Sequence, residues 1–253
     1  MKTLVIASQK GGVAKTTTTT EMAIAATEAG LAVAIIDTDP QATSCFRAEA
    51  RRGLPRSASE SERRGLPRSA RDNERRGLPQ SDNEDQRGHN DIAVTAVFPA
   101  LLPSRLKALE LAGCDLAIID TPAVSKDTAS AAIRHADLVL IPTRPAAFDL
   151  KSMLETIEQA QALGKPYAIM LTMCAPQHGP ELTPTLARMS DLHHEICPVL
   201  IHQYVAYPRA QKHGMTVQEF DPTGKAAAEM RQLYAYTCRR VGLPSATRQT
   251  AAA

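Results

Sequence analysis

The sequence contains no tryptophan, and only 4% of its 253 residues are aromatic, so a folded core has to be built from aliphatic side chains. No apolar run approaches the roughly 18 residues of a membrane span, and the one in MKTLVIA is too short for the core of a signal peptide. The few cysteines lie far apart and form no C-x-x-C pair, which excludes the usual zinc, redox-couple and cluster motifs. These thiols, which we expect to be reduced in a cytoplasm, are Cys45, Cys114, Cys174, Cys197 and Cys238.

Length and charge set wide limits. A chain of 253 residues is long enough for one sizeable α/β domain or two small ones, and we expect one. The net charge of +2 decides nothing about nucleic acid, because only a local basic patch would attract phosphates. With 43% hydrophobic and 22% charged residues, the composition is that of an ordinary globular protein.

Strand-like and helix-like segments alternate along the chain. Thr3–Ala7 is a short β-rich run, Lys15–Ala29 is helix-like, and Leu31–Asp37 is a continuous apolar run of the kind buried on both faces in a parallel sheet. Similar runs lie around Asp120, Pro142 and Thr172. Further helix-like segments span residues 126–135, 149–163, 181–195 and 223–241. The alternation predicts an α/β fold with a doubly wound, mostly parallel β-sheet flanked by helices.

Residues 51–86 break this pattern with three tandem copies of a 12-residue unit that begins RRGLP. Each copy has one large apolar residue, which buries too little surface to offset the entropy of ordering. We therefore expect a disordered insertion in a single domain, 1–253, with a flexible tail at 243–253. A basic arm for DNA or a partner is the alternative, although residues 51–88 carry ten Arg against seven acidic residues.

The stretch SQKGGVAKTT lies between the first predicted strand and helix, which is the context of a phosphate-binding loop. Gly11 and Gly12 supply open backbone whose N–H groups can converge on phosphate oxygens. Lys15 adds a point charge, and the Thr16 hydroxyl can ligate Mg²⁺. A chance Gly-Gly turn would explain the glycines, but not a seven-residue match in this context.

Two positions depart from the common phosphate-loop pattern. Gln9 and Ala14 stand where that pattern has glycine. We expect Ala14 to be tolerated if its φ is negative, and to be strained if it is not.

The motif KGGVAKTT resembles the deviant Walker A signature, K-G-G-x-x-K-T, of the ParA/MinD family, in which a signature lysine, here Lys10, opens the loop. DTDPQA (37–42) resembles the D-x-D-P-Q element of that family, and LAIIDTPA (116–123) resembles its Walker B strand. IPTRPAAFDL resembles its P-x-x-P segment, and GMTVQEFDPTGKAAAEMRQL its C-terminal loop and last helix. The likeness covers about residues 1–45 and 92–242, and it implies a P-loop NTPase fold of the deviant Walker A type.

The resemblance implies an ATPase that is weak alone and needs Mg²⁺. Lys10 would reach across a dimer interface to the partner's phosphates, Lys15 would bind phosphates of its own nucleotide, and Asp39 would position the attacking water. The loop residues expected to bind ATP are Lys10, Gly11, Gly12, Val13, Ala14, Lys15, Thr16 and Thr17. For Lys10, the alternative is a solvated surface lysine.

A magnesium site is implied at the strand ends. The expected ligands, partly through water, are the Thr16 hydroxyl and the carboxylates of Asp37 and Asp120. Asp120 ends a buried apolar run, where a carboxylate without a partner would be costly. For both carboxylates, capping of the following turn is the alternative.

Base and DNA contacts are implied less directly. Family likeness points to Thr172, Met173 and Pro222 for adenine, and ordinary loop residues are the alternative. Non-specific DNA would be held through phosphates on the C-terminal side of the dimer, although solvated helix faces would explain the same basic residues. Those residues are Arg209, Lys212, Arg231, Arg239 and Arg240.

Absences narrow the choice within the family. The chain ends VGLPSATRQTAAA, without the amphipathic basic helix of membrane-cycling MinD-like members. No cysteine motif suits a bridging cluster, and the loop begins within ten residues of Met1, which leaves no room for an N-terminal helix-turn-helix domain. We interpret the chain as a small ParA, with no membrane partner.

Two functions follow from this interpretation. In the first, ATP drives a sandwich homodimer onto non-specific DNA, and a ParB-like centromere-binding partner stimulates hydrolysis, so that a plasmid or chromosome is partitioned. The protein would be cytoplasmic, and nucleoid-associated when bound to ATP. The alternative is a nucleotide-switched adaptor that positions a protein assembly or regulates transcription. A metabolic relative such as an amidoligase is disfavoured because no added catalytic domain is present.

Overall fold

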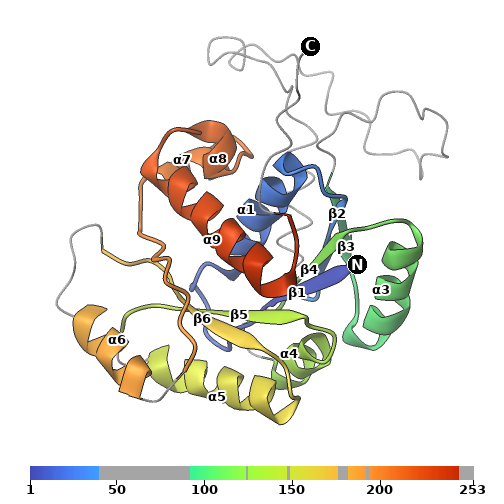
Figure 1. Ribbon diagram of the computed structural model, residues 1–253, viewed down its shortest axis with the longest axis horizontal. Helices are drawn as coiled ribbons and strands as arrows, with labels where there is room; N and C mark the ends of the chain where they lie inside the picture. The colour runs from blue at the N-terminus through green and yellow to red at the C-terminus, as the bar shows by residue number, and fades with distance from the viewer. Residues whose placement is uncertain (40–91, 124, 147–148, 176–181, 192–193, 245–253) are drawn as a thin grey trace.

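The computed structural model describes residues 1–39, 92–123, 125–146, 149–175, 182–191 and 194–244. It contains a six-stranded sheet in the order β3-β2-β4-β1-β5-β6, in which all neighbouring strands are parallel (Figure 1). The predicted α/β fold class is confirmed. The strands are β1 (Lys2–Ile6), β2 (Val33–Asp37), β3 (Ala93–Ala96), β4 (Leu116–Asp120), β5 (Leu138–Thr143) and β6 (Tyr167–Leu171).

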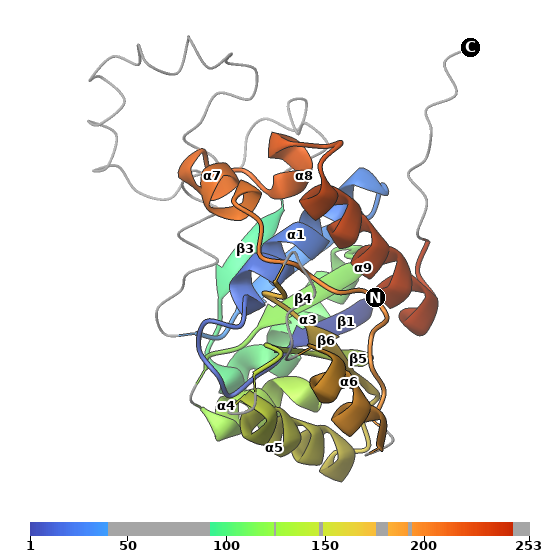
Figure 2. The ribbon, with the colours of Figure 1, turned by 90° about the vertical axis from the view of Figure 1, so that its left-hand side faces the viewer.

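Helices cover both faces of the sheet. Figures 1 and 2 show α1 and α9 on one face and α4 and α5 on the other. This arrangement is the doubly wound form predicted from the alternation of strands and helices. The helices are α1 (Lys15–Glu28), the 3₁₀ turn η4 (Pro99–Leu101), α3 (Leu102–Leu111), α4 (Lys126–Ile133), α5 (Asp149–Ala162), α6 (Leu182–Asp191), α7 (Ala206–Lys212), α8 (Val217–Phe220) and α9 (Lys225–Val241).

The strands are apolar throughout because both of their faces are buried. Along β1, Leu4 and Ile6 pack into the core beneath α1 and α9, whereas Val5 packs into the core beneath α3, α4 and α5. Both cores are mainly aliphatic, as the lack of aromatic residues predicted; Tyr234 and Tyr236 of α9 are buried exceptions.

Five elements were not predicted: β3, η4, α3, α7 and α8. β3 is a four-residue edge strand with exposed ends, so it lacks the long apolar run that marks the central strands. α3, to which no predicted element corresponds, has a proline in its first turn, where a missing N–H is tolerated. α7 and α8 have seven and four residues, too few for a clear helical period.

Three sequence predictions fall outside the described residues. They are the repeats at 51–86, Pro40–Ala42 of the DTDPQA motif, and all but the first two residues of the tail at 243–253. Within the part of the chain that the structure describes, no helix combines the length and the apolar character needed to cross a membrane.

Candidate functional site

The glycine loop and the two aspartates predicted to bind Mg²⁺ meet at the carboxyl edge of the sheet. β1 ends at Ile6 and leads into the glycine loop, and its neighbour β4 ends level with it at Asp120. Asp120 is in turn the cross-strand partner of Asp37 at the end of β2. Both carboxylate residues are only 1% exposed. In an open α/β sheet this edge is where ligands bind.

The loop backbone adopts left-handed conformations at two positions. Gly12 has φ 71° and Ala14 has φ 65°. Ala14 therefore does not meet the condition under which we expected it to be tolerated, because the left-handed region costs an L-residue roughly 1–2 kcal/mol. Gly11 and Gly12 are exposed while Val13 is buried, so the glycines form the open side of the loop.

Lys15 lies beneath this loop, at the first residue of α1. It is 8% exposed, and its Nζ donates a 2.9 Å hydrogen bond to the Lys10 carbonyl oxygen. Burial lowers the pKa of Lys15, and the charges of Asp120 and Asp39 oppose that shift. A buried ammonium with carboxylates near it is stabilised by additional anionic oxygens, which phosphates supply.

Lys10 differs from Lys15 in exposure and in partner. Its side chain is 40% exposed, and Nζ lies 3.4 Å from Oδ1 of Asp149, whose side chain is 2% exposed. Arg144 holds the same carboxylate through Nε, and its Nη2 lies 3.3 Å from Oδ1. The Arg144 hydrogen bond is the main cause that lowers the pKa of Asp149, with Lys10 adding to it. The signature lysine is therefore tied within its own chain.

The oxygens at the strand ends fit a hard cation. Mg²⁺ is commonly held by one or two carboxylates together with substrate phosphates. Asp37 and Asp120 are side by side, and the Thr16 hydroxyl is on the first turn of α1. Among the described residues, no group of three or more His, Cys, Asp or Glu residues is placed to hold a metal. A two-carboxylate site completed by phosphates fits both observations.

Asp39 follows the end of β2 by two residues. Its backbone N–H donates a 2.9 Å bond to Oδ1 of Asp37, so the two acidic residues share one turn. Thr38, between them, donates from both its N–H and its hydroxyl to the Asp120 carbonyl oxygen, at 3.0 and 2.8 Å. The turn is thus fixed to β4, and Asp39 lies near enough to Lys15 for their charges to interact.

The residues expected to contact adenine lie in different settings. Thr172 is fully buried, and its hydroxyl donates to the Val13 carbonyl oxygen in the loop. Met173, next to it, has φ 54° and is half-buried. Pro222 is exposed in the α8–α9 connection.

Four of the five basic residues predicted to hold DNA are exposed: Arg209 and Lys212 on α7, and Arg231 and Arg239 on α9. The fifth, Arg240, forms an ion pair with Glu195 and a 2.8 Å hydrogen bond with the Tyr236 hydroxyl. Arg209 and Lys212 also lie in the last turn of α7, where cations favourably oppose the helix dipole.

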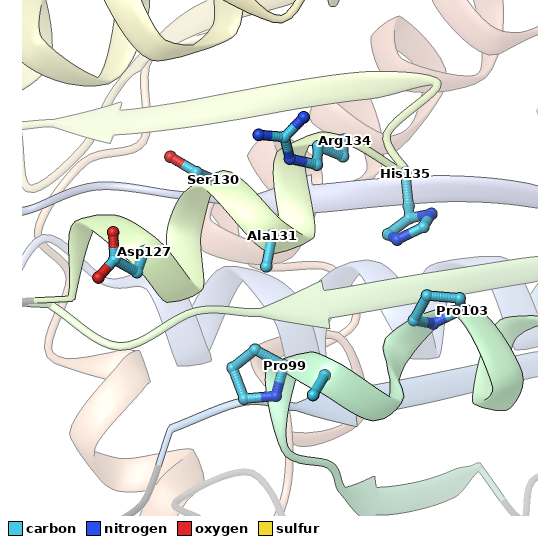
Figure 3. A pocket seen from close by; sticks show the side chains of 8 residues that line it. Pro99, Pro103, Asp127, Ser130, Ala131, Arg134 and His135 are labelled. Atoms are coloured by element: carbon cyan, nitrogen blue, oxygen red, sulfur yellow. The ribbon is translucent and has the colours of Figure 1, made fainter.

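A cavity of about 330 Å³ lies apart from the loop, between α4 and the η4–α3 segment. Figure 3 shows Asp127 and Ala131 of α4, and His135 just after the end of that helix, across from Pro99 and Pro103. None of its lining residues belongs to the predicted site.

Sequence reasoning missed Asp149, Arg144 and Glu21. The first two lie within IPTRPAAFDL, so that motif held a signal that pointed to them. Glu21 on α1 is 3% exposed and accepts hydrogen bonds from the N–H of Val217 at 2.8 Å and from Nε2 of Gln218 at 3.2 Å. Burial raises the pKa of Glu21 from 4.5 to about 7. Its partners are nearly 200 residues away, which no local pattern reveals.

Comparison with known proteins gives both a family and relatives. Residues 4–217 match the family model described as the CobQ/CobB/MinD/ParA nucleotide binding domain. Maintenance of carboxysome distribution protein A from Gloeobacter kilaueensis is 27% identical over 235 residues, which cover 92% of this chain and 90% of that protein. Protein IncC from Escherichia coli is 33% identical over 171 residues, 62% of this chain and 46% of that protein.

Solved structures share the fold. An ATP complex of McdA from Cyanothece has a TM-score of 0.67 at 19% identity, covering 96% of this chain and 97% of that one. MinD with Mg-ADP from Pyrococcus horikoshii also has a TM-score of 0.67, at 17% identity, with coverage of 95% and 97%.

Proposed function

The chain belongs to the CobQ/CobB/MinD/ParA family of nucleotide-binding domains, as its motifs predicted, and we propose that it is an ATP-switched dimer that partitions DNA. The predicted ATPase activity is confirmed. The structural relatives that hold ATP and Mg-ADP support ATP and Mg²⁺ as its cofactors. The family as a whole supports a partition or positioning ATPase. The dimer, the DNA and the cargo are the parts that we propose.

The position of Lys10 carries this proposal. Lys15 lies beneath the loop, where it would serve the nucleotide of its own chain. The second lysine, Lys10, is half-exposed and could then take another role. We assign Lys10 to the phosphates of the partner subunit, where its charge offsets the charge that develops during phosphoryl transfer. To act there it must leave Asp149, which makes hydrolysis depend on dimer formation.

The remaining residues of the edge divide the chemistry. A bound Mg²⁺ would supply positive charge that stabilises the phosphates. Thr16, Asp37 and Asp120 would hold it, and Asp39 would accept a hydrogen bond from the attacking water. The loop N–H groups would bind the phosphates, while Met173 and Pro222 would lie against adenine.

For DNA, we assign the exposed cations of α7 and α9: Arg209, Lys212, Arg231 and Arg239. Binding through them is independent of sequence and weakens steeply with salt. Arg240, because it is paired with Glu195, would contribute less. The ATP-bound form would be nucleoid-associated. A ParB-like protein would stimulate hydrolysis and so release the dimer from DNA.

A second function, positioning of a protein assembly, is favoured by one observation. The carboxysome distribution relative matches nearly the whole of both chains, whereas IncC is matched over less than half of its length. The same dimer switch could therefore position a protein assembly along DNA. A neighbouring ParB-like gene with DNA repeats would favour partition, and an operon that encodes a protein assembly would favour this second function.

DNA binding measured with ATP, ADP and no nucleotide, at two salt concentrations, tests the proposal. We expect tight binding only with ATP, and a marked loss at the higher salt. A variant with Arg209→Gln and Lys212→Gln should bind DNA more weakly while it retains ATP-dependent dimer formation. Lys107→Gln, which changes an exposed side chain of α3, is the control for the loss of a surface charge.

Two results would contradict the proposal. DNA binding that does not depend on nucleotide would remove the switch. Full ATP turnover by purified Lys15→Ala would show that the loop is not the site of hydrolysis.

A further inference from the structure

We propose that Thr172 is a positioning residue of the phosphate loop, which orients the Ala14 N–H toward the nucleotide, rather than a contact for the base. The proposal rests on the nucleotide site alone. It does not depend on whether the protein forms a dimer, binds DNA or carries a cargo.

The first observation is the contact between the end of β6 and the loop. Thr172 follows β6 directly and is fully buried, and its hydroxyl lies 3.1 Å from the Val13 carbonyl oxygen. The same hydroxyl is 3.3 Å from the Thr143 carbonyl oxygen, which already accepts the Thr172 N–H at 2.8 Å. The Val13 carbonyl is therefore the acceptor that the hydroxyl serves best. Residues 159 positions apart meet here, at the base of the loop.

The geometry of the peptide unit gives this contact its consequence. The Val13 carbonyl and the Ala14 N–H belong to one peptide group, which is trans because the described chain contains no cis bond. In a trans peptide the C=O and the N–H point in opposite directions. When Thr172 holds the carbonyl on the buried side, the N–H is directed to the other side, which Gly11 and Gly12 leave open.

The second observation is the strain at Ala14. Its φ of 65° is unfavourable for an alanine, and such a conformation persists only where the surroundings impose it. Rotation of the Val13–Ala14 peptide would relieve the strain and turn the N–H away from the phosphates. The Thr172 hydroxyl opposes that rotation, because the rotation would break the buried hydrogen bond between this hydroxyl and the Val13 carbonyl.

The test separates phosphate affinity from base selectivity. Thr172→Val removes the hydroxyl and nearly preserves volume, and Thr172→Ala removes it with less steric demand. For both variants we expect the Kd values of ADP, ATP and GTP to rise about tenfold together, the equivalent of one buried hydrogen bond. The ATP-to-GTP ratio should stay unchanged, and AMP, which lacks the β-phosphate, should be affected by less than about twofold.

Three controls accompany these measurements. Thr172→Ser keeps the hydroxyl and should restore the wild-type Kd to within about twofold. Thr237→Val removes another buried hydroxyl that donates to a backbone carbonyl, on α9, and should leave nucleotide affinity unchanged. Adding Ala14→Gly should reduce the effect of Thr172→Val, because glycine adopts a positive φ without support.

Any of four results would overturn the proposal. A changed ATP-to-GTP ratio, or an equal loss for AMP, would assign Thr172 to the base. An unchanged Kd in both hydroxyl-free variants would remove any role in the loop. Failure of Thr172→Ser to restore binding would show that the hydroxyl alone does not support the loop.

Discussion

Nζ of Lys10 lies 3.4 Å from Oδ1 of Asp149, a carboxylate that is itself buried and held by Arg144. The lysine that opens the loop is thus joined to the first residue of α5, on the opposite face of the sheet from α1. Only the Lys10 end of this pair is open to solvent. Breaking it therefore requires the lysine, and not the carboxylate, to move.

Weakening this pair should ease dimer formation. In Asp149→Asn the side chain still accepts a hydrogen bond from Arg144 but attracts Lys10 less. Because Lys10 is partly exposed, the pair contributes no more than about 0.5–1 kcal/mol. A symmetric dimer breaks two such pairs, one in each chain, so we expect the dimer formed with a non-hydrolysable ATP analogue to have a Kd about five- to thirtyfold lower by analytical ultracentrifugation.

Glu110→Gln is the control for this experiment. It neutralises the exposed partner of Lys107 on α3 and should leave the dimer Kd unchanged. Lys10→Ala should abolish stimulated turnover while ATP still binds. A dimer weakened by Asp149→Asn as strongly as by Lys10→Ala would show that the ion pair supports the dimer instead of competing with it.

Ala14→Gly should preserve nucleotide binding and stabilise the protein. Relief of the left-handed alanine is worth roughly 1–2 kcal/mol, and the greater freedom of glycine in the unfolded chain takes back roughly 0.4–1 kcal/mol. The balance is a gain of about 0.5–1 kcal/mol in the free energy of unfolding, measured by urea denaturation without nucleotide. Ala14→Val should be destabilising, since a β-branched residue is disfavoured further at this φ. A large loss of ATP affinity in Ala14→Gly would contradict the geometry of the loop.

The central part of this fold could be predicted from sequence because its signals are local. Continuous apolar runs that end in Asp37 and Asp120 indicate buried parallel strands, and the glycine loop lies directly between strand and helix. The partners of Lys10 and Glu21 could not be predicted in the same way. Asp149 and Val217 reach these residues only through the order of strands and the packing of α8 on α1, which are properties of the whole fold.

The buried carboxyl of Glu21 should make stability fall as pH rises. Its pKa is about 7 in the folded protein against 4.5 ordinarily, so between these values the folded state binds more protons than the unfolded chain. The free energy of unfolding should therefore decrease from pH 5 to pH 8, by up to roughly 3 kcal/mol from this group. Asp149, whose pKa is lowered, acts only in more acidic solution.

Glu21→Gln isolates this effect. Burial lowers the pKa of His135, with the charges of Lys165 and Arg134 adding to it, and this shift makes stability rise with pH in part of the same window. Because the variant keeps His135, the difference between wild-type and variant slopes belongs to Glu21. Urea denaturation at pH 5, 6, 7 and 8 should give a smaller decline for the variant. Parallel curves for the two proteins would show that Glu21 does not change its protonation on unfolding.

Deletion of residues 51–86 should leave the ATPase intact. β2 ends at Asp37, β3 begins at Ala93, and the two strands are parallel neighbours joined at their ends by the Val97 N–H and the Asp37 carbonyl, 2.8 Å apart. Because the strands are parallel, the chain has to return from the end of β2 to the start of β3, and such a crossover takes about a dozen residues. After the deletion, 13 residues (38–50) and 6 residues (87–92) remain for this crossover.

We expect ATP turnover and ATP-dependent DNA binding within about twofold of the full chain, because chain closure depends only weakly on loop length. A DNA affinity that falls several-fold while turnover is unchanged would instead identify the repeats as a basic arm, and a loss of both would show that the repeats are needed for the fold.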